Sequence, residues 1–255
     1  MMYDIAAAAS KGRRDYQEDA VAIDFQEHDG PGFVVLADGM GGHEAGDVAS
    51  RIVVSEFADI LKERLYDEPC EVSSIPEILK QATIAANASI ASYVARNRDV
   101  AGMGTTLLAP VLANGHLYWV SVGDSPLFLF DGENLRQVNE DHSLAPQIDL
   151  MVKSGMLDAE TARHHPDRNC LTSVLMGREI AKMDCNKPPL ELRPGNIVIV
   201  SSDGLQFLSN QEIQDIVKKH RDCRSSELVD ALMQAVEDLG DPDQDNISFA
   251  VIKVK

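Results

Sequence analysis

Acidic residues stand at five places where a predicted strand begins or ends beside glycine, asparagine or a second acid. These pairs are Glu18-Asp19, Asp38-Gly39, Gly123-Asp124, Asp203-Gly204 and Asp245-Asn246. Carboxylates at strand ends can meet at one rim of a pair of sheets, where their mutual repulsion calls for a cation. Oxygen ligands favour the hard ions Mg²⁺ and Mn²⁺ over zinc. The pattern therefore predicts a divalent metal centre.

Asp38 is the acid whose position at the end of a strand is clearest from the sequence. The apolar run from Phe33 to Ala37 reads as a buried strand that stops at Asp38, and the following glycines permit close backbone approach, so that a neighbouring carbonyl can also reach an ion. Two ions that share a carboxylate can acidify a water molecule and stabilise the attacking and leaving oxygens of phosphoryl hydrolysis. Arg14 is the candidate for holding the phosphate, because guanidinium binds phosphate through two parallel hydrogen bonds.

The elements that must position these residues follow from hydrophobic periodicity. Apolar residues recur near every 3.6 positions over 47–65 and 74–96, which predicts two amphipathic helices. Further helices are expected over about 210–219 and 225–239, and short helical pieces within 141–177. β-rich runs bounded by turn residues predict strands at 3–10, 20–25, 33–37, 105–112, 116–122, 126–130, 197–202 and 246–254. The chain shows no internal repeat or linker, so we expect a single α+β domain over 1–255, with antiparallel sheets and helices packed outside.

Composition limits the class of protein. The chain has 255 residues, of which 44% are hydrophobic, so it can bury a full core. Its formal net charge of -18 argues against nucleic acid as a partner. The four cysteines are far apart without a C-x-x-C pair, so neither a disulfide framework nor a zinc site is expected. No apolar run is long enough to cross a bilayer, and no signal pattern opens the chain, so a cytoplasmic location without a membrane partner is expected.

Six motifs in order resemble those of the bacterial PP2C family of metal-dependent serine/threonine phosphatases. They are Arg14-Asp15-Tyr16-Gln17-Glu18-Asp19, Ala37-Asp38-Gly39-Met40-Gly41-Gly42-His43, Gly104-Thr105-Thr106-Leu107, Val122-Gly123-Asp124-Ser125, Ser202-Asp203-Gly204-Leu205 and Asp245-Asn246-Ile247-Ser248. Asp141-His142-Ser143-Leu144 and the segment from His165 to Thr172 are similar to the family's flap region. A single motif carries little information, but six in the same order over nearly the whole chain are specific.

The resemblance implies a fold and a set of roles. The fold is a β-sandwich of two antiparallel sheets flanked by helix pairs, with the metals in a channel at one end. Asp38 would bridge two ions and Gly39 would offer its carbonyl to one, while Asp203 and Asp245 would complete the other. Glu18 and Asp19 would hold metal-bound waters, and Asn246 would lie beside the ligands. Asp124 would help form a weaker third metal site, and Arg14 would bind the phosphate. The implied reaction is direct attack on phosphoserine or phosphothreonine by a water that bridges the two ions, which are Mn²⁺ or Mg²⁺.

Four positions bear on how closely the chain follows the family. Gln17 stands where Asn is usual, and Pro126 replaces the Arg common after Gly-Asp-Ser. Phe207 stands where a polar or acidic residue often assists the third metal. Met40 occupies the place of a candidate general-acid His in eukaryotic relatives, although Met is usual in bacterial members. His43 is nearby in sequence, and the group that protonates the leaving alkoxide is left unassigned. We interpret Thr105 and Thr106 as structural residues near the metal cluster.

Three other classes of protein fit the sequence less well. A cysteine-dependent phosphatase needs Arg six residues after its Cys, and the four cysteines are instead followed at that spacing by Pro76, Met176, Glu191 and Val229. A calcium-binding loop would need a Gly and a terminal Glu that 241–246 lacks. A phosphoprotein-binding pseudophosphatase would keep the fold but lose ligands, whereas Asp38, Asp203 and Asp245 are all present.

The expected partner is a phosphorylated protein. This protein would be either a target of a bacterial Ser/Thr kinase or a phosphorylated anti-sigma-factor antagonist. The enzyme is expected to act as a monomer. The polar segment 141–177 is predicted to be a flap that helps choose the substrate, because long irregular segments in compact domains are usually functional or disordered. A packed accessory subdomain is the alternative for this segment, since it also carries apolar residues.

Overall fold

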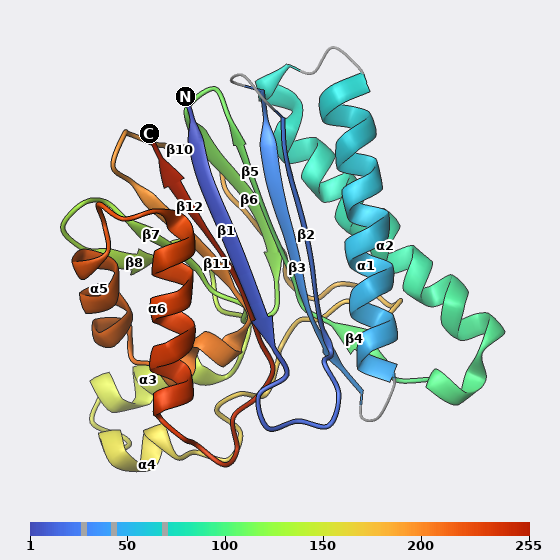
Figure 1. Ribbon diagram of the computed structural model, residues 1–255. Coiled ribbons are helices and arrows are strands. Elements are labelled where there is room, and N and C mark those ends of the chain that lie inside the picture. The colour runs from blue at the N-terminus through green and yellow to red at the C-terminus, as the bar shows by residue number, and fades with distance from the viewer. Residues whose placement is uncertain (27–29, 42–44, 68–70) are drawn as a thin grey trace.

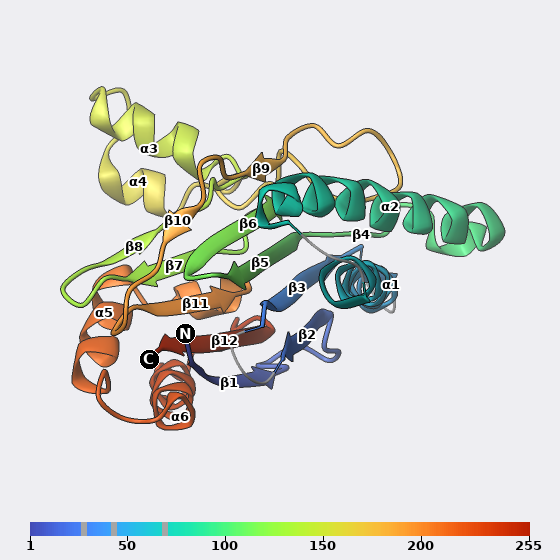
Figure 2. The same ribbon diagram turned by 90° about the horizontal axis from the view of Figure 1, so that it is seen from above.

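Two antiparallel sheets pack face to face, and helices cover the outer side of each sheet (Figures 1 and 2). The computed structural model of the protein describes residues 1–26, 30–41, 45–67 and 71–255. The predicted α+β sandwich with α-β-β-α layers is confirmed.

The two sheets have different strand orders. The first sheet runs β1 (Tyr3–Ser10), β12 (Ile247–Val254), β11 (Ile197–Ser201), β7 (Leu127–Phe130) and β8 (Leu135–Gln137). The second runs β10 (Leu190–Glu191), β6 (His116–Val122), β5 (Leu107–Ala113), β3 (Gly32–Met40) and β2 (Asp19–Phe25), with β4 (Gly104–Thr105) beside β3 and β9 (Asp184–Cys185) beside β6. Strands 33–37 and 20–25 are longer than predicted, because both continue to the acids at their ends.

The helices form two outer layers and one end group. α1 (Ala45–Lys62), extended by a π-helical turn (Glu63–Asp67), packs with α2 (Ile75–Arg96) on the second sheet. α5 (Asn210–Lys219) and α6 (Ser225–Asp238) cover the first sheet, and α3 (Ala145–Lys153) and α4 (Ala159–Arg163) lie at its lower end in Figure 1. Short 3-10 turns are Val72–Ser74, Arg98–Val100 and Asp203–Phe207. The helical stripe of α1 follows from Val53, Phe57 and Leu61, which recur every four residues and are fully buried.

β3 explains why the central apolar run is continuous. Its side chains alternate, so that Val34 and Leu36 enter the core between the sheets, while Phe33 and Val35 enter the core under α1 and α2. Both faces of this strand are therefore buried, and a buried strand reads as an unbroken apolar run. The first residue of β3 after that run is Asp38, which the strand delivers at its end.

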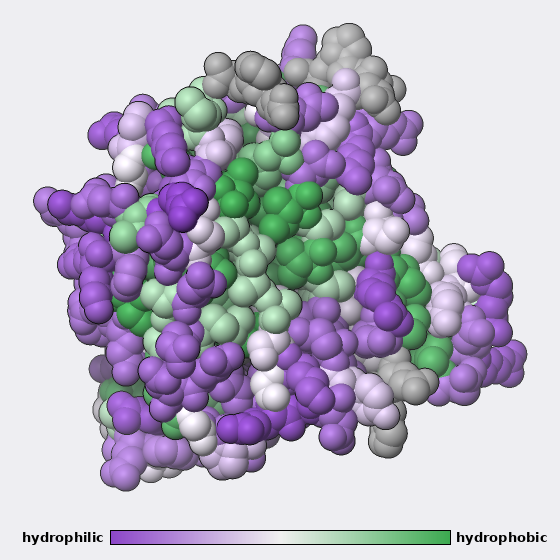
Figure 3. Space-filling model, viewed as in Figure 1, coloured by the Kyte–Doolittle hydropathy of each residue, from purple (hydrophilic) through white to green (hydrophobic). Residues whose placement is uncertain are grey.

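The open edge of the sandwich is visible between α1 and α6. β1 and β2 are the edge strands of their sheets, and Figure 3 shows an apolar strip over this region, bordered by hydrophilic residues. Ile23 on β2 contributes to the exposed apolar surface. Among the described helices, none is long and apolar enough to cross a membrane.

Candidate metal centre

Two of the predicted acids face each other across neighbouring strands. Asp19 begins β2 and pairs in register with Asp38 on β3, an arrangement in which two like charges disfavour one another. Asp19 Oδ2 also accepts a hydrogen bond from Ser202 Oγ at 2.9 Å, and Ser202 Oγ accepts one from the Ser248 amide at 3.0 Å. Because Ser202 directly follows β11 and Ser248 lies on β12, Asp19 links the two sheets at the end where the acids lie.

The backbone of Asp38 is fixed by the two threonines. Its N–H donates to Thr106 Oγ1 at 2.9 Å, and its carbonyl accepts from Thr105 Oγ1 at 2.8 Å and from the Thr106 amide at 2.9 Å. The next residue must be glycine, because a Cβ at Gly39 would lie 2.2 Å from the carbonyl oxygen of Gly46 at the start of α1. The threonines therefore have the structural role that the sequence indicated, and they set the direction in which the Asp38 carboxylate leaves the strand.

Asp203 and Asp245 come from the first sheet and reach the same place. Asp203 follows β11 and Asp245 precedes β12, which are antiparallel neighbours. Close packing of these two segments requires Gly204, where a Cβ would lie 2.1 Å from the carbonyl oxygen of Asn246. The side chain of Asp203 is hydrogen-bonded to that of Asp38. The two sheets thus bring their acids together, and we call Asp19, Asp38, Asp124, Asp203 and Asp245 the acidic cluster.

The connection between β1 and β2 brings Arg14 to the acidic cluster. Asn246 holds this connection: its Oδ1 accepts from the Glu18 amide at 2.7 Å, and its Nδ2 donates to the carbonyls of Lys11 and Tyr16, both at 2.9 Å. Arg14 Nη2 lies 2.6 Å from Asp245 Oδ2, and the Arg14 side chain is 58% exposed. The predicted phosphate-binding residue is therefore at the rim of the site, with its guanidinium paired to a predicted ligand.

Glu18 carries its carboxylate to the start of α1. Its carboxylate lies against Gly46, in the first turn of the helix, where the helix dipole favours negative charge. Its Oε1 is nevertheless buried without a hydrogen-bond partner among the described residues, and the same is true of Asp19 Oδ1. Two buried carboxylate oxygens are thus left for a group other than the described chain.

Asp124 faces a cleft of about 460 Å³. The cleft is also lined by Asp203 and Asp141, by Phe207, and by the flap residues Arg168 and Asn169. The segment 141–177 therefore lies beside Asp124, and the Phe207 ring lines the same cleft.

The acidic cluster raises the pKa values of its own members. Burial is the largest cause in each case, and it raises the pKa of Asp19 to about 7, that of Asp124 to about 7 and that of Asp203 to about 6. Burial also raises the pKa of Asp38 well above its ordinary value, and the charges of Asp19 and Asp203 raise it further. Near neutral pH, these carboxylates need either protons or cations.

Comparison with known proteins agrees with this geometry. Residues 11–245 match the family described as Protein phosphatase 2C. The chain belongs to the protein phosphatase 2C family. It is 32% identical over 245 residues to the serine/threonine phosphatase stp of Listeria welshimeri, a match that covers 95% of this chain and 92% of the relative.

Solved structures of the family superimpose on the whole chain. The serine/threonine phosphatase Stp1 from Staphylococcus aureus has a TM-score of 0.83 at 28% identity, covering 100% of this chain and 96% of that one. The catalytic domain of the phosphatase PstP, in complex with two manganese ions, has a TM-score of 0.80 at 29% identity and covers 99% of each chain. As a member of the protein phosphatase 2C family, this chain is a metal-dependent serine/threonine protein phosphatase, as the motifs predicted.

The donor set suits the ions of this family. All candidate ligands are carboxylate or carbonyl oxygens, which Mn²⁺ and Mg²⁺ favour, and the buried oxygens of Glu18 and Asp19 lack other partners. No three His, Cys, Asp or Glu side chains in the described ranges are already arranged around one ion. The carboxylate of Asp245 is paired with Arg14, and that of Asp38 with Asp203.

Some residues of the site were not found by motif reasoning, and others lie outside the described residues. Ser202 and Ser248, which hold Asp19, were read only as parts of motifs, because serine next to a strand end carries no signal of its own. Asp141 was assigned only to the flap, although its charge raises the pKa of Asp124. Gly42 and His43 fall outside the described residues, so the structure says nothing about a role for His43 in proton transfer.

Proposed function

We propose that this phosphatase hydrolyses phosphoserine and phosphothreonine at the acidic cluster, where Asp38, Asp203, Asp245 and the carbonyl of Gly39 hold two divalent ions. The observation that carries the assignment is the convergence of these acids from both sheets, with burial raising the pKa of Asp38 and Asp203. Bound Mn²⁺ or Mg²⁺ would supply the acidity that makes water a nucleophile at neutral pH.

Asp38 is the residue suited to contact both ions. Its carboxylate lies between acids of both sheets, because it is paired in register with Asp19 and bonded to Asp203. Its backbone is held by Thr105 and Thr106, so the carboxylate keeps its position when its charge is engaged. This arrangement supports the bridging role that the family motif implies for Asp38.

Arg14 is proposed to bind the phosphate of the substrate. Its guanidinium lies 2.6 Å from Asp245, at the edge of the acidic cluster, on a loop that Asn246 anchors. When Asp245 serves as a ligand, its charge is engaged elsewhere, and the guanidinium becomes available to a phosphate. Glu18 and Asp19 are proposed to hold water molecules around the ions through the buried oxygens that lack partners.

Asp124 is proposed to hold a third, weaker ion. It shares the cleft with Asp203, but the neighbouring Phe207 ring offers no oxygen ligand, so more of the coordination must come from water. Fewer charged protein ligands mean lower affinity.

We also propose the organisation and context of the enzyme. Residues 1–255 act as one catalytic domain, and 141–177 forms a flap over the cleft, a view supported by Arg168 and Asn169 in its lining. The phosphoprotein substrate comes from a bacterial Ser/Thr kinase, the enzyme works in the cytoplasm as a monomer, and its net charge of -18 disfavours nucleic acid.

The test is metal-dependent turnover of a phosphothreonine peptide. Activity should be lost in EDTA and restored by Mn²⁺ or Mg²⁺, because oxygen ligands bind these ions reversibly. Asp38→Asn should remove most turnover even at saturating Mn²⁺, whereas Asp222→Asn, which changes an acid that is 90% exposed and outside the cleft, should not. Full activity in chelator, or near-wild-type rates for Asp38→Asn, would show that the site is misassigned.

A further inference from the structure

His142 is a buried histidine next to the metal centre, and the reaction proposed above assigns it no role. Its side chain is 1% exposed and contacts Gly123, the residue before Asp124. Its Nδ1 lies 3.2 Å from the backbone nitrogen of Gly123, and its Nε2 lies 3.8 Å from Glu140 Oε2. A buried polar ring beside a catalytic turn needs a physical reason.

The contact with Gly123 fixes the protonation state of the ring. A backbone N–H can only donate, so Nδ1 must be an unprotonated acceptor, and the neutral ring carries its proton on Nε2, toward the Glu140 carboxylate. Burial lowers the pKa of His142, and Lys182 lowers it as well, against the opposing charges of Glu140, Asp184 and Asp141. The geometry and the surroundings agree on a neutral imidazole.

The same residue also holds the other side of Gly123. The amide of His142 donates to the Gly123 carbonyl at 3.0 Å, so both backbone groups of Gly123 are bonded to His142. Gly123 has φ of +105°, and a Cβ there would lie 2.6 Å from the Thr106 side chain, so this turn is open to glycine alone. The next residue is Asp124, whose direction into the cleft is therefore set by a turn that His142 fastens.

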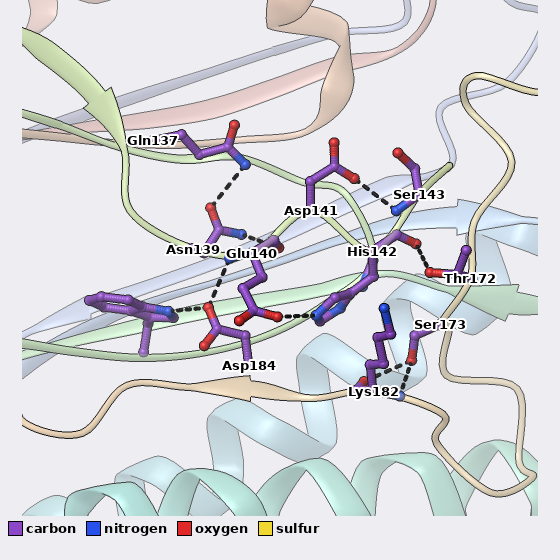
Figure 4. Close-up of polar contacts among 12 residues, drawn as sticks. Gln137, Asn139, Glu140, Asp141, His142, Ser143, Thr172, Ser173, Lys182 and Asp184 are labelled. Atoms are coloured by element: carbon purple, nitrogen blue, oxygen red, sulfur yellow. Dashed lines mark hydrogen bonds and ion pairs between the residues drawn. The ribbon is translucent and has the colours of Figure 1, made fainter. Parts of the chain in front are cut away.

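The segment that carries His142 is itself anchored. Asn139 accepts from the Leu127 amide at 2.8 Å and donates to the Ser125 carbonyl at 3.0 Å. The Glu140 amide donates to Asp184 Oδ2 at 2.9 Å (Figure 4). The ring is thus presented to Gly123 by a segment that is bonded both to the chain directly after the turn and to Asp184 on β9.

The carbonyl of His142 connects this turn to the flap. It accepts from the Thr172 amide at 2.7 Å and from Thr172 Oγ1 at 2.8 Å, where the chain returns from α3 and α4 (Figure 4). Ser143 pairs with Leu171 beside it. Both limbs of the flap therefore meet at the residue that fastens the Asp124 turn.

We propose that His142 is a positioning residue that holds the Gly123 turn, and with it Asp124, in register with the base of the flap. The inference rests on the proposed role of Asp124 in catalysis. A neutral ring with its acceptor at Nδ1 does this work, and the charge of Glu140 is not required for it.

The variants that test this proposal distinguish the hydrogen-bond acceptor of the His142 ring from the volume of the ring. Asn places Oδ1 as many bonds from Cα as Nδ1 of His, whereas Leu has nearly the same shape without an acceptor. His142→Leu should raise the Mn²⁺ concentration for half-maximal activity about tenfold, the effect expected for one lost buried hydrogen bond, and His142→Asn should recover most of that loss. His116→Leu, at a histidine bonded to the Asn114 carbonyl at the end of β6 away from Gly123, and Glu140→Gln, at a side chain that is 76% exposed, should leave the curve unchanged.

A readout without metal or turnover distinguishes this inference from the proposed function. In chelated wild-type protein, ¹⁵N spectra of His142 should show the neutral ring protonated on Nε2, and the Gly123 amide should be protected from hydrogen exchange. That protection should fall in His142→Leu and persist in His142→Asn. A ring protonated on Nδ1, unchanged Gly123 protection in a folded His142→Leu protein, or an Asn variant no better than Leu would overturn the proposal. If His142→Leu does not fold, the wild-type spectra and the comparison of His142→Asn with His142→Gln decide the question.

Discussion

Replacing Asp124 by Asn should make the metal-free protein more stable. Burial raises the pKa of Asp124 from 3.8 to about 7, and the charges of Asp203 and Asp141 contribute to the rise. A shift of this size corresponds to about 4 kcal/mol of folding free energy when the carboxylate is ionised, at about 1.4 kcal/mol per pKa unit. Because the side chain is partly open to water in the cleft, we expect about half of this, ~2 kcal/mol, which raises Tm by about 4 to 8 °C.

The gain should depend on pH in a defined direction. A carboxyl whose folded pKa is raised contributes stability that is present below 3.8 and is lost as pH rises toward about 7. Wild type therefore pays the full cost of the Asp124 charge at pH 8, whereas at pH 5 the folded carboxyl is mostly protonated. The stabilisation by Asp124→Asn should be largest at pH 8, at ~2 kcal/mol, and should be smaller at pH 5.

Urea unfolding in EDTA at both pH values measures this effect. Asp131→Asn is the matched control, because the amides of Asn134 and Glu133 lower the pKa of Asp131, so that its effect on stability is the same at pH 5 and pH 8. An Asp124→Asn protein no more stable than wild type at pH 8, or equally stabilised at both pH values, would refute the account of the acidic cluster given above.

Three further predictions concern turnover. Arg14→Ala should raise KM for a phosphopeptide more than it lowers kcat. Arg14→Lys should restore the wild-type KM only in part, because a point charge lacks the bidentate fork of guanidinium. An unchanged KM with a lower kcat would assign Arg14 to stabilisation of the transition state alone. Phe207→Asp should lower the Mn²⁺ concentration for half-maximal activity, as titration of activity would show, unless loss of the ring opens a cavity that unfolds the protein. Alanine at the exposed flap residues Leu150, Met151 and Met156 should change phosphopeptide turnover and spare p-nitrophenyl phosphate, and parallel losses on both substrates would favour a packed accessory subdomain.

The sequence determined the elements and the type of chemistry. Apolar periodicity identified α1, α2 and the long strands, because burial on one helix face or on alternate strand positions dictates where apolar residues fall. The turn at Asn114 and Gly115 was also readable, since both residues adopt the positive φ that such a turn requires. The acids at strand ends predicted oxygen-ligated metal chemistry, because residue type alone sets ligand preference.

Only the tertiary structure decided which atoms meet. The register that sets Asp19 opposite Asp38, and the Ser202 bond that ties Asp19 to the other sheet, join residues from distant parts of the chain. The same is true of His142, because no local sequence pattern predicts its contact with Gly123. A sequence specifies local preferences of backbone and burial, whereas charge repulsion, hydrogen bonds and raised pKa values depend on distances that exist only once the two sheets have packed.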